Sequence, residues 1–530
     1  MILLIFNFCI FVQTHREMKT KLLLPLFAAI ATLQACSDEV GIQLSTSCGK
    51  IEGVELEGGV KAYLGIPFAQ PPVGELRWKA PQPVEHWDGI LETKAFGNDP
   101  MQPSIYSDMV FRGPAKSEDC LYLNVWTSAK TNSDKLPVLI YFNGGGLMAG
   151  SGSEPRYDGA AISREGVIGV TANYREGIFG YLAHSELSAE SSGHGSGNYG
   201  FLDQVEAIKW VKENIKAFGG DPERITIAGE SAGSFSVSIL MASPLSKDNI
   251  AGAILSSGAE LMPIQARALS DAEMEGVALL RSKGLACIAD ARALSAEDLQ
   301  ALLPPSGMKS VVLDGYLMTE CTDSVFAKGR QADVPLLAGW NSLESMPGAA
   351  TVEDYKKQLS HLFRDKTDEI FEAYGILKDE DVLSDKGYTL AGDLFTGFPT
   401  WKACDYHART SSSPVYRYKF NHPSPEASPA PGATHSADIE YAMGNLSTNT
   451  VFDWNEEDYR ISRLFLSYYA NFCKNGNPNG EGLPQWTPIN GKPNSAPVMQ
   501  IDVESAEVAS EQRENAYRTL ERFYKSVIRN

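Results

Sequence analysis

Short, strongly apolar runs that alternate with amphipathic segments restrict the fold of this chain more than any other feature. Three of the runs are Leu136–Phe142, Val167–Ala172 and Arg224–Ala228. Each has the length and the β-branched or aromatic content of a strand buried within a sheet. Between the second and third runs, apolar residues recur at helical spacing, and Gly219 and Gly220 then end the predicted helix. Strands that alternate with helices predict an α/β fold with a large, mostly parallel sheet and helices on both faces.

Later segments continue this pattern. Further strands are predicted at Ala253–Ser256, Val334–Trp340 and Val415–Phe420, and helix-rich insertions at Leu269–Leu303 and Val352–Lys378. No long linker, charge block or internal repeat interrupts the chain after about residue 50. We therefore expect residues 37–530 to form a single α/β domain, although a length of 530 residues alone would suggest several domains.

The charge balance excludes some partners. The chain carries 66 acidic and 46 basic residues, a net charge of −20, so electrostatic binding of nucleic acid is not expected. The same charge disfavours peripheral binding to anionic membranes. The sequence does not indicate an oligomeric state.

The first 36 residues resemble a bacterial export segment. Met18, the expected start, precedes two lysines and the apolar stretch Leu22–Leu33, as in a signal sequence. The following Leu-Gln-Ala-Cys run resembles a lipobox, which implies that Cys36 is acylated and that the protein is exported to the periplasm or attached to the outer membrane. The alternatives are an ordinary cleaved signal and a short membrane anchor. Any membrane contact is therefore expected only through this N-terminal anchor.

A Gly-x-Ser-x-Gly run is the strongest catalytic signal. Gly229–Gly233 (GESAG) lies between the predicted strand Arg224–Ala228 and an apolar, helix-like segment. A tight strand-to-helix turn leaves no room for side chains beside the nucleophile, which explains the two glycines. We therefore predict that Ser231 is a nucleophile; the alternative is a tight structural turn.

The run Asn143–Gly146 directly follows another predicted strand. Glycines leave backbone N–H groups unobstructed, and an acyl-transfer intermediate needs such donors where its oxyanion forms. We predict an oxyanion hole made by the N–H groups of Gly145, Gly146 and Ala232. The alternative is a flexible loop.

The base is predicted from chain order, since an acid and then a histidine follow the serine in folds of this kind. His361 and His407 lie in helical patterns, whereas His422 ends a predicted strand and His435 lies on a long loop. A long loop can return an imidazole to the serine, so His435 is preferred and His422 is the alternative. Activity should then fall as the base protonates, near an ordinary pKa of ~6.5.

Glu344 is the preferred acid because it follows the strand Val334–Trp340 by four residues. Its carboxylate would orient the imidazole. Asp333 lies before that strand, at the wrong end, and Asp203 is expected to be an N-terminal charge or cap of a helix. The alternative for Glu344 is a solvated surface charge.

Together these motifs resemble the type-B carboxylesterases, α/β-hydrolases that include the cholinesterases. The resemblance runs from about Gly49 to the C-terminal end. It rests on Tyr63–Ala69, Pro71–Gly74, Leu76–Trp78, Glu118–Val125, the Ser231 turn, Asn341 with Glu344, and His435 with Asp438–Tyr441. The resemblance implies an α/β-hydrolase fold, a Ser231–Glu344–His435 triad and no cofactor or metal, and it favours His435 over His422.

Four positions depart from the pattern that the resemblance implies. Asn143 replaces a histidine before the glycines, Leu147 replaces a bulky aromatic residue, and Ser345 replaces a glycine after the acid. Met101 replaces the cysteine that would pair with Cys120, so the family's disulfide is expected to be absent. None of these changes removes a catalytic atom.

The sequence therefore predicts a serine hydrolase that cleaves small-molecule carboxylic esters through an acyl-enzyme. Another acyl-transfer enzyme, such as a thioesterase, an amidase or a transacylase, would use the same triad. A binding or adhesion protein on the same fold is a further alternative, but family members of that kind typically lack the nucleophile or the base. Leu147, Met148 and Phe395–Phe398 are candidates for the acyl side of the pocket.

Overall fold

The computed structural model describes residues 39–303, 307, 311–425, 430–490, 497–508 and 513–528. The predicted export segment, including Met18 and Cys36, lies outside these residues. Within them, no helix combines the length and the apolar character needed to cross a membrane.

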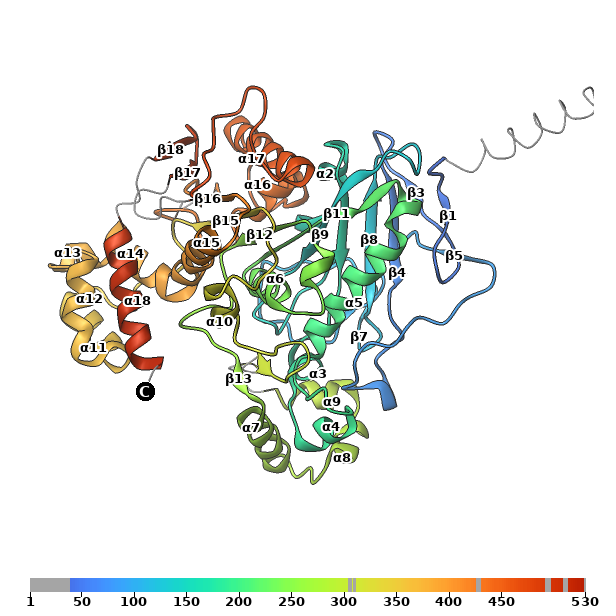
Figure 1. Ribbon diagram of the computed structural model, residues 1–530, viewed down its shortest axis with the longest axis horizontal. Coiled ribbons are helices and arrows are strands. Elements are labelled where there is room, and N and C mark those ends of the chain that lie inside the picture. The colour runs from blue at the N-terminus through green and yellow to red at the C-terminus, as the bar shows by residue number, and fades with distance from the viewer. Residues whose placement is uncertain are drawn as a thin grey trace, which may run out of the picture.

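One large sheet organises the chain (Figure 1). Its strands lie side by side in the order β18-β17-β16-β15-β12-β11-β9-β10-β8-β4-β3. They are β3 (Val54–Glu55), β4 (Lys61–Pro67), β8 (Tyr122–Thr127), β9 (Leu136–Phe142), β10 (Ile168–Ala172), β11 (Gly220–Glu230), β12 (Gly252–Ser256), β15 (Leu336–Asn341), β16 (Val415–Phe420), β17 (Val498–Ile501) and β18 (Ala506–Val508). In this order across the sheet, every pair of neighbouring strands between β17 and β10 is parallel. The antiparallel pairs are β18 with β17 at one edge, and β10 with β8, β8 with β4 and β4 with β3 toward the other.

The remaining elements are short strands and helices. The short strands are β1 (Gln43–Ser45), β2 (Lys50–Glu52), β5 (Ile90–Glu92), β6 (Asp99–Pro100), β7 (Lys116–Ser117), β13 (Arg267–Ala268) and β14 (Val312–Leu313). The α-helices are α2 (Ala160–Arg164), α3 (Gly177–Tyr181), α4 (Ser185–Glu190), α5 (Tyr199–Asn214), α6 (Ala232–Ala242), α7 (Leu269–Ser282), α8 (Ile288–Arg292), α9 (Ala296–Gln300), α10 (Thr322–Ala327), α11 (Val352–Phe363), α12 (Thr367–Ala373), α13 (Asp379–Val382), α14 (Asp385–Gly392), α15 (Phe398–Thr410), α16 (Ile439–Met443), α17 (Glu456–Asn475) and α18 (Glu514–Ile528).

The two faces of the sheet are buried by different helices. Val138 and Ile140 of β9 belong to an apolar cluster that includes side chains of α5 and α6. Leu139 and Tyr141, the alternate residues of the same strand, belong to a second cluster with side chains of α16 and α17. Successive side chains of a strand point to opposite faces, so a strand covered on both faces must be apolar throughout. The predicted α/β fold is therefore confirmed.

The predicted elements are confirmed with small shifts in their ends. β9 and β16 have the predicted bounds, whereas β11 extends from Gly220 to Glu230 and so reaches the nucleophile turn directly. The predicted helix after β10 is α5 followed by a 3-10 turn, Ile215–Phe218. Gly219 ends it with φ of 82°, a left-handed conformation that favours glycine.

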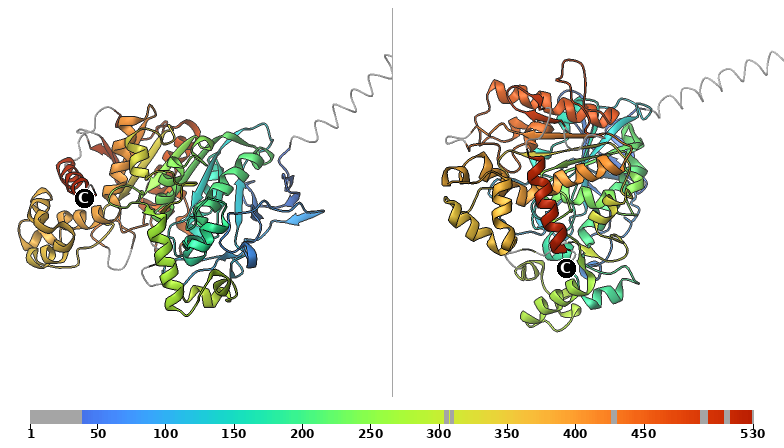
Figure 2. Two further views of the ribbon diagram at one scale, coloured as in Figure 1. Left: turned by 60° about the horizontal axis from the view of Figure 1, so that its bottom comes forward. Right: turned by 60° about the vertical axis from the view of Figure 1, so that its left-hand side comes forward.

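The helical insertions form two groups beside the sheet (Figures 1 and 2). Helices α7, α8 and α9 lie at the bottom of Figure 1, and α11 to α14 lie with the C-terminal helix α18 at its left. Side chains of α11, α12, α15 and α18 share one apolar cluster, which includes Phe363, Phe371, Trp401 and Tyr517. The C-terminal helix thus packs this insertion against β15, since Trp340 of β15 belongs to the same cluster. The segment that follows β15 and carries Glu344 is called the acid loop.

Two of the sequence motifs are joined by a buried ion pair. Arg77 donates from Nε and Nη2 to the two carboxylate oxygens of Glu118, at 2.6 and 2.5 Å. Arg77 Nη1 also donates to the carbonyl groups of Ala291, Arg292 and Leu294. A bidentate arginine pair of this kind fixes geometry. This ion pair therefore serves the scaffold.

Candidate active site

Ser231 occupies a strained turn between β11 and α6. Its φ and ψ are 54° and −122°, an unusual conformation for a residue with a side chain. A Cβ atom on Gly229 would lie 2.4 Å from the carbonyl carbon of Gly233, and one on Gly233 would lie 2.1 Å from the carbonyl oxygen of Phe142. The two glycines therefore allow the turn to pack against itself and against β9, as predicted.

The structure brings Ser231, His435 and Glu344 into one hydrogen-bonded chain. His435 Nε2 lies 2.9 Å from Ser231 Oγ, and His435 Nδ1 lies 2.5 Å from Glu344 Oε2. Glu344 is only 5% exposed, so its carboxylate is not a solvated surface charge. The distances fit a nucleophile, a base and an orienting acid.

Glu344 is held from several directions. Its Oε1 accepts hydrogen bonds from the backbone N–H of Asn341 at 2.6 Å and from Ser257 Oγ at 2.5 Å. The backbone N–H of Leu343 donates to the carbonyl of Ala433, which ties the acid loop to the loop that carries His435. The acid is therefore positioned by the ends of β12 and β15 and by the loop that carries its histidine.

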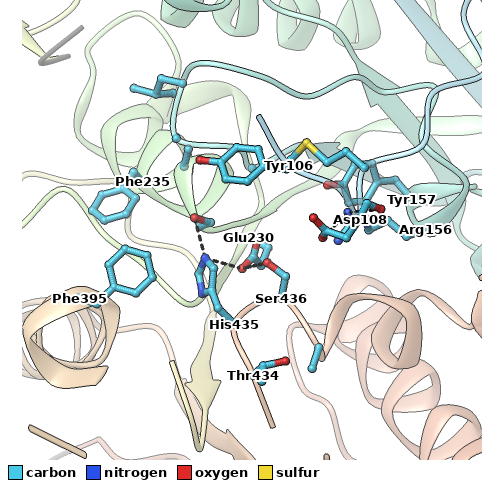
Figure 3. A pocket seen from close by; sticks show the side chains of 18 of the residues that line it. Tyr106, Asp108, Arg156, Tyr157, Glu230, Phe235, Phe395, Thr434, His435 and Ser436 are labelled. Atoms are coloured by element: carbon cyan, nitrogen blue, oxygen red, sulfur yellow. Dashed lines mark hydrogen bonds and ion pairs between the residues drawn. The ribbon is translucent and has the colours of Figure 1, made fainter. Parts of the chain in front are cut away.

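Glu230 is a carboxyl group at the site that sequence reasoning missed. Its Oε1 lies 3.3 Å from His435 Nε2 and accepts a hydrogen bond from Ser436 Oγ at 2.8 Å (Figure 3). Burial raises the pKa of Glu230 to about 7, and the histidine lowers it in part. The only available signal was that Glu230 directly precedes the nucleophile, which does not reveal the contact.

Glu230 and Glu344 raise the pKa of His435, the predicted base. Burial lowers the pKa of His435, but Glu230 and Glu344 outweigh it, and the pKa rises to about 9. The ordinary value expected from the sequence is therefore too low for this site. The imidazolium is favoured because negative charge lies on both sides of the ring.

A second hydrogen-bond network lies behind the acid loop. Asp438 accepts hydrogen bonds from Tyr418 Oη at 2.8 Å and from Asn341 Nδ2 at 3.2 Å. Tyr418 Oη also bonds to Ser256 Oγ at 2.8 Å. Burial raises the pKa of Asp438 to about 6. This network connects the ends of β12 and β15 with β16 and steadies the loop that holds Glu344.

The predicted oxyanion loop follows β9 and faces Ser231. Gly145 and Gly146 have φ of 112° and 68°, and both line the same pocket as Ser231 and Ala232. Within the described residues, no hydrogen-bond acceptor takes the backbone N–H of Gly145, Gly146 or Ala232. Ala232 begins α6, where backbone N–H groups lack partners within the helix. These three groups are therefore available to an oxyanion.

Asn143, one of the four departures, anchors this loop from inside. Its Nδ2 donates to the carbonyl of Gly144 at 3.0 Å and to Glu176 Oε1 at 3.2 Å. Tyr174 Oη donates to the Asn143 carbonyl at 2.7 Å. Burial raises the pKa of Glu176 well above its ordinary value. A buried carboxyl group thus supports the amide that stands where the resemblance implies a histidine.

The other departures also have clear places. Leu147 lines the pocket with φ of 58°, and Ser345 is half-buried directly after the acid. Cys120 is buried with a free thiol, and Met101, which has no thiol to pair with it, lines the same small cavity.

A pocket of about 640 Å³ opens above the triad. In Figure 3, Phe235 and Phe395 lie on one side of His435, and Asp108, Arg156 and Tyr157 lie on the other. The Phe395 ring centre is 4.9 Å from that of His435. Of the residues suggested for the acyl side, Leu147 and Phe395 line the pocket, whereas Met148 and Thr396–Phe398 are not among its lining residues.

Other candidate residues lie away from Ser231. His422 Nε2 bonds to Asp458 at 2.9 Å, His361 lies on α11, and His407 is buried on α15 between Gln331 and the Val334 carbonyl. The structure therefore places His435, and none of these, at the serine. Asp333 accepts hydrogen bonds from Ser411, Ser412 and Ser413, before β15.

The expectation for Asp203 was wrong. It does not begin α5 but lies within it, four residues after Tyr199, and it is fully buried. Arg175 binds both of its carboxylate oxygens, at 2.7 and 2.8 Å. A buried partner, invisible in the local sequence, explains this carboxylate better than a helix end does.

Comparisons with known proteins agree with this geometry. The sequence model of the Carboxylesterase family matches residues 41–520. The chain is 35% identical over 486 residues to the fumonisin B1 esterase of Sphingopyxis macrogoltabida, with 87% of each chain covered. It is 32% identical to a human cocaine esterase, with 83% of this chain and 85% of that protein covered. Among solved structures, a PNB esterase matches with a TM-score of 0.77 and 29% identity, covering 90% of this chain and 99% of that one.

Proposed function

The chain belongs to the carboxylesterase family and hydrolyses carboxylic esters, and we propose that Ser231, His435 and Glu344 perform this reaction. The observation that carries the assignment is the continuous hydrogen-bond chain from Ser231 Oγ through both ring nitrogens of His435 to Glu344. It lies at a pocket large enough for a small-molecule ester.

The first half of the reaction acylates the serine. Ser231 Oγ attacks the ester carbonyl carbon while His435 Nε2 accepts the hydroxyl proton. Glu344 holds the other ring nitrogen and stabilises the imidazolium. The tetrahedral intermediate collapses as His435 returns the proton to the leaving alcohol, and the acyl group remains on Ser231.

Water completes the cycle. His435 accepts a proton from water, the hydroxide attacks the acyl carbon, and Ser231 leaves as the proton returns to it. In both halves, the N–H groups of Gly145, Gly146 and Ala232 stabilise the negative oxygen. The N-terminal end of α6 adds a favourable dipole at the same position.

Ser231→Ala tests the assignment. Removal of the nucleophile should lower kcat for p-nitrophenyl butanoate by at least about 10⁴-fold. The alanine variant should retain the wild-type circular dichroism spectrum and melting temperature, because among the described residues Ser231 Oγ makes no hydrogen bond besides that to His435. Undiminished turnover in a folded variant would overturn the proposal.

We also propose that residues 1–36 direct export and that Cys36 carries a lipid, so that the protein is attached to a membrane only through this anchor, in the periplasm or at the outer membrane. The support is the sequence pattern of charge, apolar stretch and lipobox-like cysteine. Metabolic labelling with an alkyne fatty acid in a bacterial host should mark the wild-type chain and not Cys36→Ser. Equal or absent labelling of both chains would contradict lipidation.

A further inference from the structure

The pocket is divided between two chemistries. Phe235 and Phe395 form an aromatic side, and Asp108 and Arg156 bring charges to the opposite side of His435 (Figure 3). An ester has an acyl half and an alcohol half on either side of its reacting carbonyl. A pocket with aromatic rings on one side and charges on the other therefore fits an ester whose two halves differ in polarity.

Arg156 is held firmly in the polar side. Its Nε donates to Glu154 Oε1 at 2.7 Å, and its Nη2 donates to Asp108 Oδ2 at 3.0 Å. Asn445 Nδ2 donates to the Arg156 carbonyl at 3.1 Å, which fixes the backbone as well. The side chain is 9% exposed. The guanidinium thus has a defined orientation and loses little freedom when it binds a further group.

One nitrogen of this guanidinium group, Nη1, has no hydrogen-bond partner among the described residues, unlike Nε and Nη2. Nη1 is not fully enclosed by the protein, and Arg156 is one of the residues that line the pocket. An arginine fixed by two carboxylates with its third nitrogen open is a preformed hydrogen-bond donor.

We propose that Arg156 is a specificity-determining residue that donates hydrogen bonds from Nη1 to an oxygen on one half of the substrate. The preferred substrates are then esters with one apolar half and one half that bears hydroxyl groups. This inference rests on the proposed function, because Ser231 fixes where the ester carbonyl lies.

The neighbouring charges favour a hydroxyl group over a carboxylate. Glu154 and Asp108 both pair with Arg156, and Glu440 also lines the pocket. The side chain of Asp108 is 66% exposed. These acids offset the positive charge, and they can accept a hydrogen bond from a hydroxyl group but would repel an anion. A hydroxylated group satisfies both the open donor and the acids around it.

Matched esters test the proposal in both orientations. The first set has phenylacetate as the apolar half, esterified to propanol, glycerol or 3-hydroxypropanoate. The second set has benzyl alcohol as the apolar half, esterified to butanoate, glycerate or succinate. In one of the two sets, wild-type kcat/KM for the hydroxylated ester should exceed that for the alkyl ester by about tenfold, the effect of one charge-assisted hydrogen bond.

Arg156→Lys assigns the preference to the guanidinium. Lysine can keep the ion pair with the buried Glu154 but has no second nitrogen that could take the place of Nη1. The ratio of kcat/KM for the hydroxylated ester to kcat/KM for the alkyl ester should therefore fall to near one. Arg112→Lys is the matched control, because Arg112 pairs with Asp158 at 2.9 Å near the same loop yet does not line the pocket. Its ratio should equal that of the wild type.

Each outcome has a distinct meaning. A preference for the hydroxylated ester that Arg156→Lys abolishes supports the proposal, whereas a preference for the carboxylate ester contradicts it. If wild-type kcat/KM is nearly the same for the hydroxylated and the alkyl ester in both sets, the proposal is overturned, even if Arg156→Lys does not fold. It is also overturned if Arg156→Lys shows the same ratio of these two values as the wild type. Those results leave ester hydrolysis intact, whereas absence of turnover on every ester would contradict the proposed function instead.

Discussion

The acid loop and the nucleophile turn place a carboxyl group on opposite sides of His435, but they treat it differently. On the acid loop, Glu344 accepts hydrogen bonds from Asn341, Ser257 and the histidine. At the nucleophile turn, Glu230 accepts one from Ser436 and lies 3.3 Å from His435 Nε2. Donors fix the direction of a carboxylate, so Glu344 is built to orient the ring, whereas Glu230 acts on it mainly through charge.

This difference has a geometric basis. Glu344 contacts the ring nitrogen that faces away from the serine, where a fixed acceptor sets the tautomer. Glu230 contacts the same nitrogen that must receive the serine proton. A strongly bound carboxylate at that position would compete with the serine hydroxyl. The weaker contact leaves Nε2 free for the reaction.

Exchanging each carboxylate for an amide should separate the two roles. Glu344→Gln should lower kcat by about 10² to 10⁴-fold, because the wrong tautomer of His435 is then favoured. Glu230→Gln should lower kcat by less than about tenfold, since Ser436 and the scaffold still hold the side chain. Steady-state kinetics on p-nitrophenyl butanoate measures both, and equal losses would show that the two carboxyl groups are not distinct in role.

The pH at which activity falls on acidification should depend on the charge of Glu230. Because the reacting base must be neutral, kcat/KM rises as His435 loses its proton, and a pKa raised to about 9 places this rise, the acidic limb of the pH profile, above pH 6.5. Glu230 is the first of the groups that raise this pKa, so Glu230→Gln should move the limb to lower pH. A limb that stays in place, or moves to higher pH, would contradict the charge effect.

A smaller effect is expected at the second donor to Glu344. Ser257→Ala removes the 2.5 Å hydrogen bond to Oε1 but leaves those from Asn341 and His435. We expect kcat to fall by about three- to tenfold with KM nearly unchanged. Ser234→Ala is the matched control, because Ser234 donates to the Gly258 carbonyl and not to the acid. A larger loss in the control would assign the effect to packing.

Most of the fold was readable from local pattern. Strand β9 is apolar throughout because both of its faces are buried, and that property is visible in seven consecutive letters. The nucleophile was readable because a strand, two glycines and a helix surround Ser231. The order of acid and histidine then reduced the choice of partners to a few residues.

The remaining features depend on contacts between distant segments. Asp203 meets Arg175, and Glu230 meets His435 across 205 positions of the chain. No periodicity marks such pairs, since each side chain also fits a solvent-exposed or helical position. Their burial and altered pKa values arise only when the sheet brings the loops together.

The most direct test of the account is covalent labelling of the serine. A fluorophosphonate should modify one residue of the wild-type protein, identified by mass spectrometry as Ser231, with displacement of fluoride. Ser231→Ala should not react, and Glu344→Gln should react far more slowly than Glu230→Gln. Modification of another residue, or labelling that persists in folded Ser231→Ala, would contradict the assignment.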